Sequence, residues 1–166
     1  MIHYMPSPAV ISSSIKILES GLTISFAESA STGRLVYDYT SVPGCGTIVQ
    51  GSIVCYDRSV KETLFEIDPA IIDEHSAESA EVTRLLAEGL AKLLPADIRI
   101  ALTGLASPGG SEHEEKPVGT MFVHGFIGKH EWKRRFFFEG APDDIIASTI
   151  NATALALLDE LKACGY

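Results

Sequence analysis

Cysteine and long hydrophobic runs are both scarce in this sequence. The three cysteines, Cys45, Cys55 and Cys164, form an odd set without CxxC spacing, which indicates reduced thiols rather than a disulfide framework or a cysteine-rich metal site. The longest apolar stretches fall far short of the roughly 20 residues that span a bilayer, and no basic segment followed by an apolar one opens the chain. We therefore expect a soluble, cytoplasmic protein.

Positive charge is sparse as well. The chain carries 13 Lys and Arg residues against 22 Asp and Glu residues, which gives a net charge of -9. Binding to nucleic acid or to an anionic membrane needs a basic surface, so we expect neither partner. A substrate that is itself an anion would need a locally basic pocket.

The composition is that of one folded domain. With 166 residues, 46% of them hydrophobic and 21% charged, the chain is long enough for a single core and too apolar for disorder. No linker divides it, so we predict one domain over residues 1–166, with residues 1–6 as a loose leader. The apolar excess is compatible with a homo-oligomer built on a symmetric interface.

Hydrophobic periodicity and turn residues predict alternating helices and strands. The predicted helices cover residues 7–20 and 34–40, two short segments that begin at Ser59 and Asp68, and residues 80–93 and 142–163. The predicted strands cover residues 22–27, 47–56, 97–102, 118–127 and 132–138. This order favours an α/β fold, a three-layer α/β/α sandwich on a mixed, mostly parallel sheet of about five strands.

Polar or glycine-rich segments follow three of the predicted strands, after Ala27, Tyr56 and Leu102. In parallel α/β sheets ligands bind outside the carboxyl ends of the strands. We therefore expect these three segments to converge on one site.

The first segment places Ser29, Ser31 and Thr32 at the start of a predicted helix. Hydroxyls beside unpaired N–H groups and the positive end of the helix dipole suit a phosphate or an oxyanion. Ordinary capping of the helix explains the same pattern. If Ser29 is a nucleophile, its base must come from elsewhere, because no GxSxG motif indicates a Ser-His-Asp triad.

Lys61, just beyond the second segment, is a candidate base. An amine in a partly desolvated pocket beside another cation, such as Arg58, can be neutral near physiological pH. A solvated surface lysine is the ordinary alternative.

No spacing of residues indicates a metal site. The histidines lack ligand-like spacing. Glu112, Glu114 and Glu115 suit a divalent cation or a solvated loop tip, and the solvated tip is the commoner case. The preceding stretch 103–110 offers hydroxyls and N–H groups to an anion, without matching a Walker loop or a dinucleotide fingerprint.

Four segments, in order, resemble the CinA C-terminal domain family over about residues 8–162. They are Ala27-Glu28-Ser29, residues 51–61, residues 103–110 and residues 115–120. The corresponding motifs of family members are, in the same order, AESCTGG, YSNEAK, TGIAGPGG and EKPVGT. The resemblance implies an α/β/α fold and, for active members, hydrolysis of nicotinamide mononucleotide to nicotinate mononucleotide and ammonia without a redox cofactor.

The resemblance also assigns roles to residues. Ser29 matches the family's serine and becomes the nucleophile, Lys61 becomes its base, and Tyr56 becomes a proton relay. Backbone N–H groups near Ser29 and Ser31 would stabilise the oxyanion. The positions assigned to substrate binding are Glu28, Ser31, Thr32 and Arg58, with Thr103, Ser107, Gly109 and Lys116 for the phosphoribosyl end.

Three short segments depart from the family pattern. Ala30-Ser31-Thr32-Gly33 replaces CTGG, Asp57-Arg58-Ser59-Val60 replaces SNEA, and Ala106-Ser107-Pro108 replaces AGP. Side chains thus stand at two positions where the family has glycine. We therefore keep two functions open, an amidohydrolase acting on a pyridine nucleotide and a non-catalytic nucleotide-binding or regulatory domain.

Overall fold

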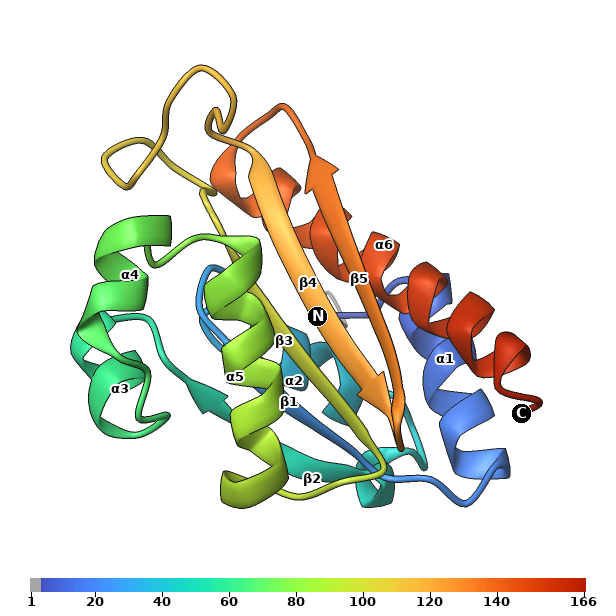
Figure 1. The fold of residues 1–166 in the computed structure, drawn as a ribbon. Helices are drawn as coiled ribbons and strands as arrows, with labels where there is room; N and C mark the ends of the chain where they lie inside the picture. The colour runs from blue at the N-terminus through green and yellow to red at the C-terminus, as the bar shows by residue number, and fades with distance from the viewer. Residues whose placement is uncertain (1–3) are drawn as a thin grey trace.

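The computed structural model describes residues 4–166, which form a five-stranded mixed sheet (Figure 1). The strands lie in the order β2-β1-β3-β4-β5. Their bounds are β1 Ile24–Glu28, β2 Val49–Val54, β3 Ile98–Gly104, β4 Thr120–Ile127 and β5 His130–Phe137. Strand β1 pairs in parallel with β2 and β3, whereas β4 is antiparallel to both β3 and β5. Four strands therefore share one direction, which confirms the predicted mixed, mostly parallel sheet.

Helices cover both faces of this sheet and give the predicted three layers (Figure 1). One face carries α1 Pro8–Glu19, α2 Arg34–Thr40 and α6 Pro142–Ala163, and the other carries α3 Arg58–Thr63, α4 Pro69–His75 and α5 Ala80–Leu93. A short 3-10 turn, η1 Gly46–Ile48, leads into β2. None of the helices within residues 4–166 has the length and hydropathy needed to cross a membrane.

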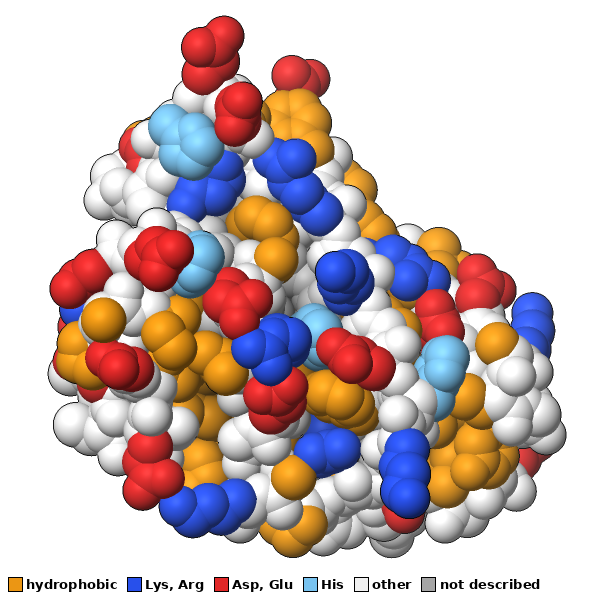
Figure 2. Space-filling model, viewed as in Figure 1, with side chains coloured by type: hydrophobic (Ala, Val, Ile, Leu, Met, Phe, Trp, Pro, Cys, Tyr) orange, Lys and Arg blue, Asp and Glu red, His pale blue; other side chains and the backbone are white. Residues whose placement is uncertain are grey.

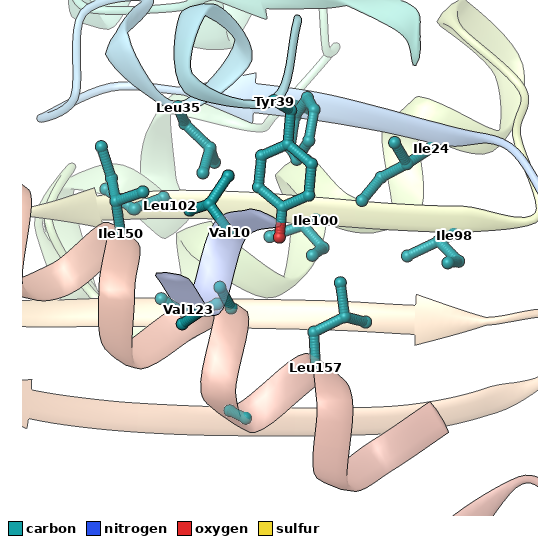
Figure 3. Packing of buried hydrophobic residues seen from close by; sticks show 14 of the residues in the cluster. Val10, Ile24, Leu35, Tyr39, Ile98, Ile100, Leu102, Val123, Ile150 and Leu157 are labelled. Carbon is teal, nitrogen blue, oxygen red and sulfur yellow. The ribbon is translucent and has the colours of Figure 1, made fainter. Parts of the chain in front are cut away.

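The larger core lies between the sheet and the layer of α1, α2 and α6. Figure 3 shows aliphatic side chains of the sheet meeting side chains from all three helices, among them Val10, Leu35, Tyr39, Ile150 and Leu157. Fully burying one such side chain contributes about 1.5–3 kcal/mol. A second core, on the other face, joins Leu86 and Leu90 of α5 to Ile72 of α4. The two cores hold the carboxyl edge of the sheet in place from both sides.

Side-chain caps mark the starts of α1, α3 and α5, and the start of α3 differs from the sequence prediction. The Ser7 and Ser79 hydroxyls accept backbone hydrogen bonds at the starts of α1 and α5, as predicted. Helix α3, however, begins at Arg58, because Asp57 rather than Ser59 caps it. Ser76 ends α4 and caps no following helix.

Part of the predicted leader packs against the domain. Residues 1–3 lie outside the described residues. Pro6 is buried, and the Tyr4 ring packs on Tyr37 with 5.1 Å between the ring centroids. The Tyr4 hydroxyl donates a hydrogen bond to Asp38. Tyr4 and Pro6 therefore contact the domain.

A buried carboxylate fixes the turn between β1 and α2. Glu28, the last residue of β1, has no exposed surface and accepts five hydrogen bonds. The donors are the Ser31 hydroxyl at 2.7 Å, the Ser52 hydroxyl at 2.8 Å, and the N–H groups of Gly33, Leu35 and Val36 at 3.0 Å each. This carboxylate satisfies N–H groups that the first turn of α2 leaves unpaired, and it joins that turn to β2.

Close packing of Gly125 against Trp132 gives a first prediction. A β-carbon at Gly125 would lie 2.3 Å from Trp132 Cε2, whereas one at Gly46 would meet nothing within 4 Å. Gly125→Ala should therefore lower the free energy of unfolding by about 1–3 kcal/mol. The chain has one tryptophan, so urea unfolding can be followed by its fluorescence. Equal unfolding free energies for Gly125→Ala and the control Gly46→Ala would contradict the packing.

The hydrogen bonds of Glu28 give a second prediction. In Glu28→Gln one acceptor oxygen becomes an NH₂ donor, which faces N–H and hydroxyl donors without an acceptor. We expect a loss of about 2–4 kcal/mol in the free energy of unfolding, measured by urea titration at pH 7. The control is Glu88→Gln, which removes an exposed ion pair with Arg84. It should change the free energy of unfolding by less than about 1 kcal/mol. Similar losses in the two variants would refute a special role for Glu28.

Candidate active site

A cavity of about 360 Å³ opens at the carboxyl edge of the sheet, where the turn after β1 meets the loop between β3 and β4. Cavities of this size hold small ligands. Its lining comprises Ser29, Ala30, Thr32, Tyr56 and Glu78, residues 104–110, and Pro142 and Ile146 of α6. The predicted convergence of the three segments is therefore confirmed.

Ser29 and Lys61 meet at the wall of this cavity. Ser29 Oγ lies 3.2 Å from Lys61 Nζ, although 32 residues separate the two along the chain. Ser29 lines the cavity and is 5% exposed, whereas Lys61 lies behind it with no exposed surface. The pair thus has the hydrogen-bond reach that a nucleophile and its base require.

The partners of Lys61 Nζ suit a neutral amine. Besides Ser29, Nζ contacts the backbone carbonyl of Cys55 at 2.5 Å and that of Tyr56 at 3.2 Å. An ammonium form donates to both carbonyls and to Ser29 Oγ, whereas a neutral amine keeps two N–H bonds for the carbonyls and has a lone pair to accept the Ser29 O–H. Burial away from water lowers the pKa of Lys61 below its ordinary value, which favours this state.

Cys55 lies beside the pair without competing for its proton. Its Sγ is 3.5 Å from the Glu28 carbonyl, and burial raises the pKa of the thiol to about 11. A thiol in this state is a poor nucleophile and a poor base. Ser29 is therefore the nucleophile that the geometry offers to a ligand.

The turn after Ser29 presents backbone N–H groups. The Ser29 N–H itself donates to the Leu102 carbonyl at 3.0 Å, so it is engaged with the end of β3. Within residues 4–166, the N–H groups of Ala30 and Ser31 make no hydrogen bond. They are the donors available for an oxyanion formed on Ser29, as predicted for this turn.

Four other residues predicted for the site line the cavity. These are Thr32, Tyr56, Ser107 and Gly109. Thr32 has a φ of 48°, an uncommon conformation for a residue with a β-carbon. Tyr56 is 67% exposed at the mouth of the cavity. Its ring is therefore free to reach a bound ligand.

The side chains of Glu28 and Ser31, which were predicted to bind substrate, do not line the cavity. Both are buried, and the Ser31 hydroxyl donates to Glu28. The polar atoms of both side chains form hydrogen bonds within the turn after β1. Through these hydrogen bonds the two side chains fix the turn that carries Ser29.

Arg58, Thr103 and Lys116 also fall outside the cavity lining, so the structure does not bring these predicted binding residues to the cavity. The Arg58 guanidinium pairs with Glu62 and, at 2.6 Å, with Asp73 on the surface. Thr103 is buried and its hydroxyl lies 2.8 Å from that of Thr83. Lys116 Nζ donates to Ser111 of its own loop and to Ser76 and Glu78 of the segment between α4 and α5.

Sequence reasoning missed Glu78, Pro142 and Ile146, which line the cavity. Glu78 lies in the segment before α5 and Pro142 opens α6, where both look like ordinary helix-start residues. Only the packing of distant segments brings them to Ser29. No local pattern could have identified them.

Comparisons with known proteins agree with this fold. The model of the family described as CinA C-terminal domain matches residues 9–162. The chain is 38% identical over 120 residues to a CinA-like protein of Synechococcus sp. (strain CC9902), which covers 71% of this chain and 28% of that protein. It is 34% identical over 149 residues to a putative competence-damage inducible protein of Geobacillus kaustophilus, covering 89% of this chain and 36% of that one. The chain thus spans about a third of the length of these curated relatives.

Solved structures share the fold at low sequence identity. The competence/damage inducible protein CihA from Agrobacterium tumefaciens superposes with a TM-score of 0.85 at 23% identity, over 97% of this chain and 99% of that one. The competence damage-inducible protein A from Klebsiella pneumoniae gives a TM-score of 0.85 at 22% identity, over 92% of this chain and 95% of that one. With the fold and the family match in agreement, this chain belongs to the CinA C-terminal domain family.

Proposed function

We propose that this protein is a serine–lysine amidohydrolase that converts nicotinamide mononucleotide and water into nicotinate mononucleotide and ammonia. The observation that carries the proposal is the 3.2 Å approach of Ser29 Oγ to the buried Lys61 Nζ at the wall of a ligand-sized cavity. The choice of substrate rests on the CinA resemblance. Its ligand is accordingly a small pyridine nucleotide.

The chemistry follows from the protonation states of the pair. Neutral Lys61 takes the hydroxyl proton of Ser29 as Oγ attacks the carboxamide carbon, and the N–H groups of Ala30 and Ser31 stabilise the tetrahedral oxyanion. The C–N bond then breaks as Lys61 returns the proton to the departing nitrogen, which leaves as ammonia. Lys61 next deprotonates a water molecule that attacks the acyl carbon. This step releases the carboxylate product and restores the Ser29 hydroxyl.

A second function is favoured by two side chains in the lining. Thr32 and Ser107 line the cavity where family members have glycine. Their β-carbons alter the space available to a ligand. A non-catalytic nucleotide-binding domain is therefore the competing proposal, which predicts binding without ammonia release.

The nucleophile assignment is tested by ammonia release from nicotinamide mononucleotide. Ser29→Ala should lower kcat by about 10³-fold or more, because the covalent route needs its oxygen. The control is Ser12→Ala, an exposed position on α1, which should retain full activity. Undiminished ammonia release by Ser29→Ala would eliminate the mechanism, and tight binding by the wild type without turnover would support the competing proposal.

The base assignment predicts a pH dependence. Below its pKa Lys61 is an ammonium ion and cannot accept a proton, so kcat/KM should rise by about tenfold per pH unit until that pKa is reached. Because burial lowers the pKa, the plateau should begin below the ordinary lysine value of 10.5. Initial rates of ammonia release at pH 6 to 10 measure this profile. An activity that declines steadily over the range would be incompatible with a lysine base.

A further inference from the structure

Two further cavities adjoin on the β4–β5 hairpin, on the face of the sheet that carries α5. One has a volume of about 330 Å³ and the other about 320 Å³, and Arg135 lines both. Neither shares a lining residue with the cavity beside Ser29. Lys133, Arg135 and Phe137 alternate along β5 and therefore point to one face of the hairpin. Together the two cavities form a groove that the proposed hydrolysis does not use.

The cavity of about 330 Å³ is lined by cations and by no carboxylate. Lys133 and Arg135 are exposed at its wall, and Lys133 Nζ forms no ion pair within residues 4–166. Arg135 donates a hydrogen bond to the carbonyl of Glu115, a neutral acceptor that leaves the charge of the guanidinium uncompensated. The third cation, Arg134, is paired with Glu160 at 2.6 Å. Figure 2 shows Lys and Arg side chains gathered over the upper parts of β4 and β5.

The start of α5 adds to the positive potential of this cavity. Ala80, the first residue of the 14-residue helix, lines the cavity, and the first turn of such a helix carries a partial positive charge. Two acidic side chains of the surrounding segments are engaged with other groups, Glu131 with His124 at 2.9 Å and Glu81 with Arg84 at 2.5 Å. Neither acid lines the cavity. The surroundings thus favour an anionic group.

The adjoining cavity of about 320 Å³ is largely apolar and contains an unpaired hydroxyl. Pro117 and Phe137, whose ring is 53% exposed, offer apolar surface to it. Thr120 also lines this cavity and is 1% exposed, and its hydroxyl has no hydrogen-bond partner in the described part of the chain. A buried hydroxyl without a partner costs free energy. A ligand that forms a hydrogen bond with Thr120 would remove this cost.

We propose that this groove binds a nucleoside monophosphate, with its base in the apolar cavity and its phosphate in the cationic one. Lys133, Arg135 and the first turn of α5 bind the phosphate. The exposed ring of Phe137 stacks on the base, and the Thr120 hydroxyl forms a hydrogen bond with a polar atom of the ligand. Lys133 and Phe137 lie four residues apart on one strand, about 13 Å, which suits a ligand with a ring at one end and an anion at the other.

Titration calorimetry with adenosine monophosphate, adenosine and inorganic phosphate tests the two halves of the groove. The monophosphate should bind at least about tenfold more tightly than adenosine or phosphate alone, because only it occupies both cavities. Lys133→Gln should weaken its binding by about tenfold. The matched control is Lys129→Gln, which removes the same charge from the exposed turn of the same hairpin and should leave the affinity unchanged. Equal affinities for adenosine and its monophosphate, or equal losses in the two lysine variants, would overturn the proposal.

Thr120→Val tests the apolar cavity without changing the charge. Valine keeps the shape of threonine but lacks the hydroxyl, so the variant should bind adenosine monophosphate several-fold more weakly. The free energy of unfolding, measured by urea titration, should stay the same or rise, because an unpaired buried hydroxyl is removed. Wild-type affinity in this variant would contradict the proposed position of the base.

The groove and the proposed hydrolase function fail separately. Lys133 lies outside the cavity of the candidate active site, so Lys133→Gln should release ammonia from nicotinamide mononucleotide at the wild-type rate. Calorimetry with adenosine monophosphate needs no turnover, so an inactive wild type would refute the hydrolase while the groove is still measured. Binding of the monophosphate that Lys133→Gln leaves unchanged would refute the groove and leave the hydrolase untouched.

Discussion

The burial of Glu28 with five donors is the interaction on which the site depends. Burying a carboxylate away from water costs free energy unless its oxygens accept hydrogen bonds from the protein. The backbone around Glu28 can therefore adopt few other conformations. The turn that follows β1 is shaped by this requirement. Ser29 stands next to the carboxylate in the sequence, and its position is therefore set by an electrostatic constraint rather than by packing alone.

Lys61, in contrast to Glu28, is buried in surroundings that disfavour its charged form. Its ammonium form loses hydration in the interior and finds neutral carbonyls but no carboxylate within hydrogen-bond distance. Burial therefore lowers the pKa of Lys61 below its ordinary value, which makes the neutral amine more accessible for proton transfer. The buried Glu28 and the buried Lys61 thus lie on neighbouring segments, one beside Ser29 in the sequence and the other within hydrogen-bond distance of its hydroxyl.

Local patterns in the sequence predicted the elements of the fold, and the family resemblance predicted the Ser29–Lys61 pair, but several predicted binding residues do not line the cavity. Helix α5 and the final helix α6 were predictable because Ser79 and Pro142 give sharp start signals to strongly patterned segments. Ser31, Thr103 and Lys116 looked like anion donors because of their residue types. Their polar atoms are used by Glu28, Thr83 and the loop at Ser111, and such pairings depend on tertiary contacts that no local window contains.

The reversed direction of β4 has a consequence for how members of this family can diverge. Because β4 runs against β3, the loop between them leaves and re-enters the sheet at the same edge, and Leu105 and Thr120 close it with a hydrogen bond of 3.0 Å. Insertions or exchanges in this loop leave the strand register untouched. Ser29 and Lys61 lie on other segments, so the side chains of residues 106–118 that line the cavity can change while the position of this pair stays the same.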